Sequence, residues 1–297
     1  MLRIGIVGSD NSHALAYSKL ANVDKIAGDT CRVVGIWGHE PSRTEEVARD
    51  GEIETIVSRP EELLGMVDAV IVDDRHGDLH REHALPFLEA GLPVYVDKPF
   101  AVSLTDCREM LAAAERSGAL LSSFSPLRVA PATVAMAEQL EPKGTIKVAH
   151  FAGPCDFESQ YAGPFFYATH VIEIALRLLG SEIERLRAVR VGKNVAVQLA
   201  TSGGALASFS YLGDAAYHFH ASLFGTDGMV AGEIVGGAGS YAEVLKAFLK
   251  MIETGRRPLD DQQLLHPIAV VHAVQASLSG GGREVEVATM LDGDRSS

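Results

Sequence analysis

The stretch VDAVIVDDRHGDLHREHALPFLEAGLPVYVDKPFA occupies residues 67–101 of the chain. It opens with an apolar run that predicts a strand over residues 68–73, continues into an amphipathic helix over 78–90, and returns to a strand over 93–97. Gly91 follows the helix, where a left-handed cap favours glycine. A strand–helix–strand order of this kind predicts two parallel strands joined by a right-handed crossover, with both faces of the sheet covered.

The same alternation extends over the first 124 residues. Apolar runs predict strands at residues 2–8, 32–37, 53–57, 68–73, 93–97 and 119–124. Amphipathic stretches predict helices at residues 12–27, 41–50, 60–66, 78–90 and 103–117. Repeated βα units build a doubly wound parallel sheet. We therefore predict an α/β fold whose first domain, residues 1–124, is of the dinucleotide-binding Rossmann type.

The pattern changes after residue 125. Strands are predicted at residues 144–153, 183–191, 194–201, 204–212, 217–225, 228–235 and 284–288, and helices at 163–179, 240–254 and 260–278. Consecutive strands without intervening helices favour an antiparallel sheet. Residues 125–297 are therefore predicted to form an α+β domain with a mostly antiparallel sheet, for substrate binding and oligomerisation, and the tail 292–297 is expected to fray.

The loop after the first strand offers a phosphate site. Gly8 is followed by Ser9-Asp10-Asn11-Ser12-His13 and then by a predicted helix, whose amino end attracts anions. Gly8 is the only glycine that remains of a G-x-G-x-x-G pattern, because Asp10 and His13 stand at the other two positions. An N-cap role for Asp10, Asn11 or Ser12 is equally compatible with this sequence.

The end of the second strand bears on the choice of cofactor. A carboxylate at this position commonly holds the adenosine ribose of NAD. Here the strand runs into Gly38-His39-Glu40, and Arg43 follows shortly after. NAD and NADP therefore both remain open, because Arg43 lies where it could meet a 2′-phosphate.

Several segments together resemble the glucose-fructose oxidoreductase / inositol dehydrogenase family, often written Gfo/Idh/MocA. The resemblance rests on the helix with His80 and His83, the turn at residues 89–93 and the motif Asp97-Lys98-Pro99. Residues 163–173, the Thr254–Pro258 segment and the Gly281–Val285 segment extend it along nearly the whole chain. The resemblance implies an NAD(P)-dependent oxidoreductase that transfers a hydride between the nicotinamide and a sugar, polyol or related hydroxylated molecule.

The resemblance also implies roles for individual residues. Lys98 and His170 correspond to the catalytic residues, and Lys98, Tyr167 and His170 are expected to contact substrate. Histidine is a suitable base for a hydroxyl proton, and an ammonium stabilises a developing alkoxide. The residues predicted to bind cofactor are Gly8, Ser9, Asp10, Asn11, Ser12, His13, His39, Asp73, Asp74, Asp97, Lys98 and Pro99.

Departures from the family pattern keep a second function class open. Phe166 stands where many members have an aspartate, and the acidic pair Asp73-Asp74 follows the fourth strand. The alternative is a family member without redox chemistry, which acts as a small-molecule binding protein or as a lyase or isomerase in the same cleft. No spacing matches a known metal signature, so no metal ligand is predicted, although Asp73, Asp74 and His76 could converge.

Composition limits the partners. The chain has 297 residues, is 47% hydrophobic and carries a formal net charge of −13, which disfavours nucleic acid and acidic membranes. No apolar run reaches the length of a membrane span and no signal peptide is recognisable. Cys31, Cys107 and Cys155 are too few and too distant for a disulfide framework, so a cytoplasmic location is expected. The C-terminal sheet is expected to form a homodimer or homotetramer.

Overall fold

The computed structural model describes residues 1–292, so the prediction for the tail lies, from residue 293 onward, outside the described residues. The chain divides into two compact units. The first contains Met1–Phe124 together with Tyr241–Leu264, and the second contains Ser125–Ser240 and the chain from Leu265 onward. The structure therefore gathers 241–264 with the first unit, whereas the predicted division assigned every residue after 124 to the second domain.

A six-stranded parallel sheet forms the centre of the first unit, in the order β3-β2-β1-β4-β5-β6. Its strands are β1 (Leu2–Val7), β2 (Cys31–Trp37), β3 (Thr55–Ile56), β4 (Ala69–Val72), β5 (Val94–Val96) and β6 (Leu121–Ser122). Its helices are α1 (Ser12–Ser18), α2 (Pro41–Asp50), α3 (His80–Glu89), α4 (Leu104–Ser117) and α7 (Ala238–Thr254). This arrangement confirms the predicted doubly wound α/β fold.

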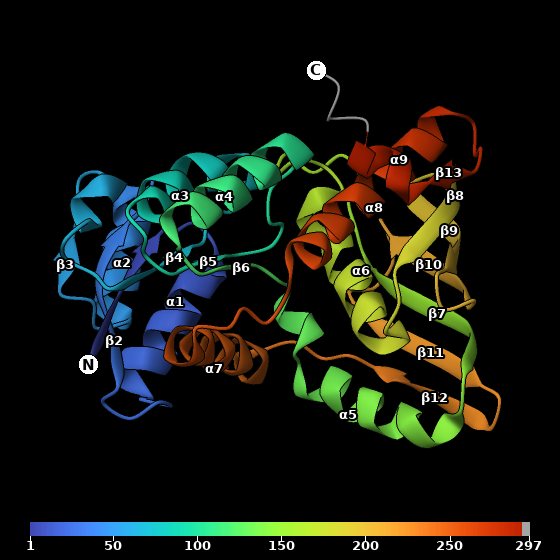
Figure 1. Ribbon diagram of the computed structural model, residues 1–297, viewed down its shortest axis with the longest axis horizontal. Helices are drawn as coiled ribbons and strands as arrows, with labels where there is room; N and C mark the ends of the chain where they lie inside the picture. The colour runs from blue at the N-terminus through green and yellow to red at the C-terminus, as the bar shows by residue number, and fades with distance from the viewer. Residues whose placement is uncertain (293–297) are drawn as a thin grey trace. The chain divides into compact units, whose positions relative to one another are not determined.

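Burial explains why the strands of this sheet are apolar along their whole length. All four residues of β4 are buried, and so are the last four of β1. Helices α3 and α4 pack together on one face, while α1 lies on the other (Figure 1). The order in which strands are added to the sheet reverses between β1 and β4. The carboxyl ends of these two neighbouring parallel strands therefore form the edge at which doubly wound sheets bind ligands.

Local details differ from the prediction in two helical stretches. The predicted helix 12–27 is α1 followed by a π-helical turn at Lys19–Val23, and the predicted helix 60–66 is a short 3₁₀ turn at Pro60–Leu63. Buried Asn22 stabilises the first of these, because its amide donates to the carbonyls of Val33 and Gly51 and accepts from the Val33 N–H. Periodicity alone does not reveal such a side-chain bridge.

The second unit is built on a seven-stranded mixed sheet with the order β12-β11-β7-β10-β9-β8-β13. Its strands are β7 (Ile146–Pro154), β8 (Ile183–Val191), β9 (Asn194–Thr201), β10 (Leu206–Leu212), β11 (His220–Gly225), β12 (Gly228–Glu233) and β13 (Val285–Glu286). Every pair is antiparallel except β7 with β10, as the α+β prediction expects. The associated helices are α5 (Pro131–Leu140), α6 (Phe165–Leu179), α8 (Asp261–Ser279) and α9 (Val287–Asp292).

Helix α6 packs against β7 and is apolar on most of its surface, which explains its burial (Figure 1). Helix α5 was not predicted, and the predicted strand 284–288 shortens to β13 before α9 begins.

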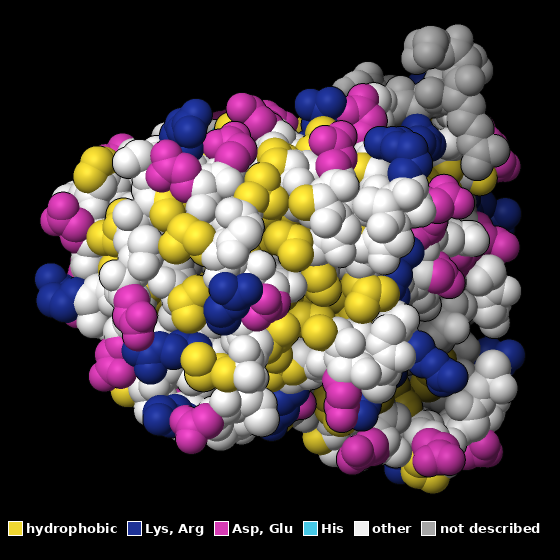
Figure 2. Space-filling view, turned by 60° about the vertical axis from the view of Figure 1, so that its left-hand side comes forward, with side chains coloured by type: hydrophobic (Ala, Val, Ile, Leu, Met, Phe, Trp, Pro, Cys, Tyr) yellow, Lys and Arg dark blue, Asp and Glu magenta, His cyan; other side chains and the backbone are white. Residues whose placement is uncertain are grey.

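None of the described helices has the length and apolar character needed to cross a bilayer. On the face shown in Figure 2, basic and acidic side chains of the described residues are interspersed rather than gathered into one field.

Candidate functional site

Gly8 ends β1 in a conformation that only glycine adopts readily. Its φ is +103°, and a Cβ atom there would lie 2.6 Å from the backbone carbon of Asp73 and the backbone nitrogen of Asp74. The first loop therefore presses directly against the loop after β4. Asn11 caps α1, since its side-chain oxygen accepts from the Ser12 N–H at 2.8 Å, and this confirms the N-cap interpretation for that residue.

Two carboxylates from neighbouring strand ends lie beneath this loop. Asp73 follows β4 and Asp97 follows β5, and both are fully buried. The Asn11 amide donates to both, at 3.2 Å and 3.4 Å, and His13 Nδ1 donates to Asp97 at 3.0 Å. All four residues, Asn11, His13, Asp73 and Asp97, were predicted from the sequence as cofactor contacts. That Asn11 and His13 hydrogen-bond to the two carboxylates was not predicted.

The two buried carboxylates have opposite pKa shifts. Burial, reinforced by the charge of Asp97, raises the pKa of Asp73 well above its ordinary value. Burial acts in the same direction on Asp97, but the charge and hydrogen bond of His13 outweigh it and the pKa of Asp97 is lowered. Of the two carboxylates, Asp73 therefore takes up a proton more readily than Asp97.

Lys98 follows Asp97 at the carboxyl end of β5 and is 5% exposed. Burial lowers its pKa, and the negative charges of Asp97 and Asp73 oppose this effect. The ammonium group therefore belongs to the same electrostatic unit as the acidic pair. Such a lysine loses its proton more easily than a surface lysine, which suits a group that acts on a substrate hydroxyl.

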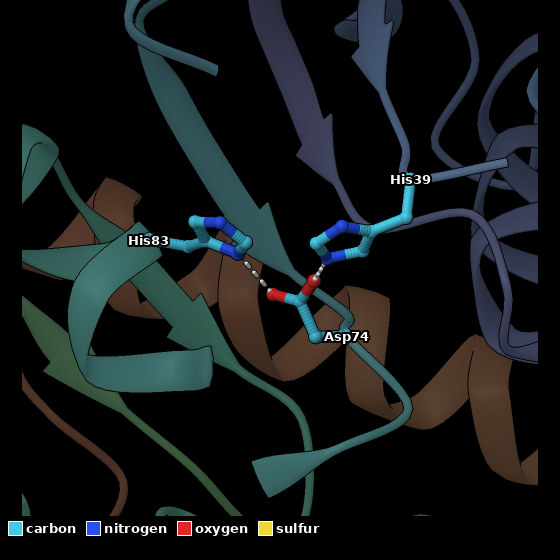
Figure 3. Close-up of side chains that lie close together, drawn as sticks. All are labelled: His39, Asp74 and His83. Atoms are coloured by element: carbon cyan, nitrogen blue, oxygen red, sulfur yellow. Dashed lines mark hydrogen bonds and ion pairs between the residues drawn. The ribbon is translucent and has the colours of Figure 1, made fainter. Parts of the chain in front are cut away.

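Asp74, the second residue of the acidic pair in sequence, lies in a different cluster. Its carboxylate accepts from His39 Nε2 at 3.1 Å and from His83 Nδ1 at 2.7 Å, so the two rings contact one side chain (Figure 3). Burial would raise the pKa of Asp74, but these two hydrogen bonds outweigh it and the pKa is lowered. The same bond to Asp74 raises the pKa of His39. The sequence did not predict His83 as a site residue, although it noted the histidine on this helix.

His80 joins the loop after β4 to the loop after β5. It is fully buried, its Nε2 lies 2.9 Å from the Asp74 carbonyl oxygen, and its Nδ1 lies 2.7 Å from the Pro99 carbonyl oxygen. Carbonyl oxygens only accept, so both ring nitrogens donate when both hydrogen bonds form, which makes the ring a cation. The charge of His80 contributes to the lowered pKa values of Asp74 and Asp97.

Replacing His80 by leucine is expected to destabilise the first unit by about 1–3 kcal/mol per unsatisfied carbonyl, because two buried acceptors lose their donor. Thermal or urea unfolding measures this loss. The control is His218→Leu, which removes an exposed imidazole paired with Glu233 and should shift stability by no more than about 0.5 kcal/mol. Equal stability of the two variants would contradict the bridging role.

The missing acid at the end of β2 has a steric cause. A Cβ atom on Gly38 would lie 1.9 Å from Ser9 Oγ, and that hydroxyl is bonded to Thr44 at 2.8 Å. Ser9 therefore contacts α2, and its side chain is committed to the protein rather than directed at a phosphate. Arg43 donates from Nε to the Ser9 carbonyl at 3.3 Å, which places its guanidinium beside the first loop.

The remaining predicted site residues lie on α6 in the second unit. His170 is 7% exposed, and its Nδ1 is hydrogen-bonded to Ser125 Oγ at 2.6 Å. The ring of Tyr167 lies 5.7 Å from the His170 ring, and Phe166 packs against Tyr161 and Tyr167. Phe166, at the position of the usual family aspartate, is thus part of an aromatic cluster.

Glu173 lies one turn after His170 on α6 and pairs with Arg128, whose Nη1 donates to Oε2 at 2.8 Å. Burial raises the pKa of Glu173, and Arg128 opposes the shift. Of His170, Glu173 and Arg177 on this helix, only Arg177 is exposed. Ser125 and Arg128 come from a segment for which no element was predicted.

The site thus has the architecture of a Rossmann domain with ligand-facing groups at the ends of β1, β4 and β5. Residues 2–125 match the family GFO_IDH_MocA, described as an oxidoreductase family with an NAD-binding Rossmann fold. Residues 2–125 of this chain are thus similar to that family, in agreement with the resemblance found in the sequence.

Curated relatives support the same assignment. The chain is 37% identical over 110 residues to a 1,5-anhydro-D-fructose reductase of Ensifer adhaerens, which covers 36% of this chain and 33% of the relative. It is 30% identical over 125 residues to a scyllo-inositol 2-dehydrogenase (NADP(+)) of Bacillus subtilis, which covers 41% of this chain and 33% of the relative. The chain thus spans about a third of the length of the curated relatives it matches.

Solved structures extend the likeness in fold to both units. A scyllo-inositol dehydrogenase from Lactobacillus casei, solved with NAD(H) and scyllo-inositol, superposes with a TM-score of 0.82 at 16% identity and covers 97% of this chain and 99% of its own. A myo-inositol 2-dehydrogenase from Lactobacillus plantarum gives 0.82 at 15% identity, with 96% and 99% coverage. These structures establish the fold of the whole chain.

Proposed function

We propose that this protein is an NAD(P)-dependent oxidoreductase that transfers a hydride between the nicotinamide and a sugar, polyol or related hydroxylated molecule. The observation that supports this most directly is Lys98, a buried ammonium at the carboxyl end of β5 in the same cluster as Asp73 and Asp97. The family match over 2–125 and the relatives named as sugar and inositol enzymes point the same way.

The described residues fit a dinucleotide. The charges of Asp74 and Asp97 are compensated by histidines, so these carboxylates do not present uncompensated charge to a pyrophosphate. Among the described residues, Asp10 Oδ1, Asp73 Oδ2 and Asp97 Oδ1 are buried without a hydrogen-bond partner. Buried oxygens of this kind call for hydrogen-bond partners, and the hydroxyls of a ribose or a polyol can both donate and accept.

In this proposal the first domain, residues 1–124, binds the cofactor along the loop 8–13. In the second unit, His170 and Tyr167 are the residues that the family resemblance assigns to the substrate. A bound nicotinamide supplies the hydride acceptor or donor. Lys98 stabilises negative charge on the reacting oxygen, and His170, fixed through Nδ1 by Ser125, moves the hydroxyl proton at Nε2.

Fluorescence titration with NADH and NADPH tests cofactor binding. We expect micromolar binding by the wild-type protein, and NADPH binding about tenfold weaker in Arg43→Ala if the guanidinium meets a 2′-phosphate. Arg49→Ala is the matched control, because Arg49 lies on the same helix and pairs with Asp50 at the surface. Unchanged NADPH affinity in Arg43→Ala would show that Arg43 does not contact a 2′-phosphate. Failure of both cofactors to bind at millimolar concentration would refute the oxidoreductase.

The second candidate is a family member without redox activity that binds a small molecule or acts as a lyase or isomerase. The raised pKa of Asp73, beside Asp97 and Lys98, favours it, because a carboxyl group with a raised pKa can exchange protons without a nicotinamide. A substrate screen that follows product formation with and without cofactor separates the two. Turnover in the absence of any nicotinamide would establish this second function.

We also propose that the sheet of the second unit associates with a second copy of the chain. Four exposed apolar side chains lie in one row across adjacent strands: Leu206 pairs with Val148, Val148 with Phe224, and Phe224 with Met229. Their exposed fractions are 59%, 45%, 44% and 48% respectively. A row of this kind on a sheet face is an unfavourable surface for a monomer.

The buried free thiols of all three cysteines support a reducing, cytoplasmic location.

Phe224→Glu is expected to convert the oligomer into a monomer, because it puts a charge in the centre of this apolar row. Light scattering after gel filtration measures the change in mass. Arg187→Glu, on the same sheet in β8, alters an exposed polar position and should leave the mass unchanged. A wild-type protein that is already monomeric would contradict the proposal.

A further inference from the structure

The cluster of His39, Asp74 and His83 has the composition of a metal site rather than of an ion pair. His39 lies in the loop after β2, Asp74 in the loop after β4, and His83 on α3. Figure 3 shows the two imidazole rings directed at the same carboxylate, one from each side. One nitrogen of each ring and one carboxylate oxygen all lie within 4.8 Å of one another.

Charge compensation alone does not require this arrangement. Asp74 carries one negative charge, and the positive charge of His80 already lies close enough to lower its pKa. A single further imidazole would satisfy the carboxylate, yet both of its oxygens accept from a histidine. Two imidazoles and one carboxylate from three separate elements are a donor set that binds first-row divalent cations.

The distances fit a common ion. Zinc–nitrogen and zinc–oxygen bonds of about 2.0–2.1 Å place neighbouring ligand atoms roughly 3 Å apart. The nitrogen–oxygen distances here are 3.1 Å for His39 and 2.7 Å for His83. An ion bound by these three residues would replace the two hydrogen bonds. We propose that His39 Nε2, the Asp74 carboxylate and His83 Nδ1 bind one divalent cation of the zinc class.

The surroundings are those of a supported site. Trp37 lies against both rings, with centroid distances of 4.5 Å to His39 and 4.9 Å to His83, and thus restricts their orientation. His80 fixes the Asp74 main chain. The side chain of His39 is 38% exposed whereas Asp74 is fully buried, so an ion can enter from the His39 side and keep water in its remaining positions.

The neighbouring cluster of His13, Asp73 and Asp97 serves as a contrast. Its ligand atoms also converge, but the Asn11 amide donates to both carboxylates, and a cation would face these N–H groups. All three residues are buried. The positive charge of a metal is therefore expected at Asp74, at the end of the sheet where Rossmann domains bind the adenosine ribose, and not at the Asp73–Asp97 pair.

Cobalt(II) titration of the chelator-treated, full-length protein tests this site without any nicotinamide cofactor. We expect one Co²⁺ per chain with visible d–d absorption that zinc abolishes by displacement. His39→Ala and His83→Ala each remove one ligand of the ion. Each variant should weaken Co²⁺ binding by more than about 100-fold, because the loss of a residue that only supports a ligand already costs about 10–100-fold. His218→Ala, which removes an exposed histidine paired with Glu233, should bind like the wild type.

A second measurement separates loss of a ligand from loss of the fold. Excess Zn²⁺ should raise the melting temperature of the wild type and of His218→Ala, because an ion bound only to the native state stabilises it, and should not raise that of His39→Ala. His39 is partly exposed, so this variant should fold. Equal Co²⁺ affinity of the wild type and His39→Ala, or no stoichiometric binding at millimolar Co²⁺, would refute the site. Neither result would bear on the nicotinamide titration above.

Discussion

Lys98→Met should lower kcat by about 10²–10³-fold, which is the usual cost of removing one group that stabilises charge in a transition state. The reason is the position of the ammonium at the end of β5, where it lies in the cluster of buried carboxylates. Methionine keeps most of the apolar part of the side chain and removes the ammonium group with its charge and N–H donors. Steady-state kinetics on a polyol that the wild type oxidises, together with NAD(P)H titration, measure the effect.

The pH profile sharpens this prediction. Burial lowers the pKa of Lys98, so the ammonium loses its proton at a lower pH than an ordinary lysine. The wild-type rate should fall as the pH rises through that lowered value, because the neutral amine no longer stabilises an alkoxide, and this limb should vanish in Lys98→Met. Lys246→Met, at the surface beside Glu243, is the control. A variant with wild-type kcat would remove Lys98 from the chemistry.

The fold of the first unit was predictable because its cause is local. A strand such as β4 is buried on both faces, and its four consecutive apolar residues record that burial directly. The position of Asp73 and Asp97 at one edge of the sheet was also predictable, because each residue directly follows a strand. The doubly wound parallel sheet and the mostly antiparallel second sheet followed from how helices alternate with strands along the chain.

The compensation of those charges was not predictable, because it depends on contacts between residues distant in sequence. Asn11 and Asp73 are 62 residues apart, and His39 and Asp74 are 35 apart. The acidic loop therefore suggested repulsion of a cofactor, whereas the structure shows carboxylates already held by histidines. The spacing of His80 and His83 on one helix after an Asp-Asp pair was the signal that could have suggested this neutralisation.

In the second unit, a buried ion pair depends on a side chain from a segment with little periodicity. Arg128 closes a short 3₁₀ turn at Pro126–Arg128, and its guanidinium is 13% exposed beside Glu173, which is 6% exposed. Arg128→Met should destabilise the protein by about 3–5 kcal/mol, because it leaves a buried carboxylate without its counter-charge. Urea unfolding near neutral pH measures this loss.

The size of the effect should depend on pH. Burial raises the pKa of Glu173 in the folded protein above its value of about 4.3 in the unfolded chain. Protonation of Glu173 therefore stabilises the folded state fully below the unfolded pKa. This contribution is lost as the pH rises through the folded pKa. Removing Arg128 takes away the interaction that opposes the shift. The variant should therefore be markedly less stable at about pH 8 than at about pH 5, relative to the wild type.

Two further variants decide whether the carboxylate is the cause. Glu173→Gln in the Arg128→Met background should recover part of the lost stability and remove its pH dependence, because a neutral amide needs no counter-charge. Arg177→Met, an exposed position on the same helix, should change stability by less than about 0.5 kcal/mol. If Arg128→Met were destabilised equally at both pH values, lost packing of the arginine side chain would account for the effect, and the buried charge would not.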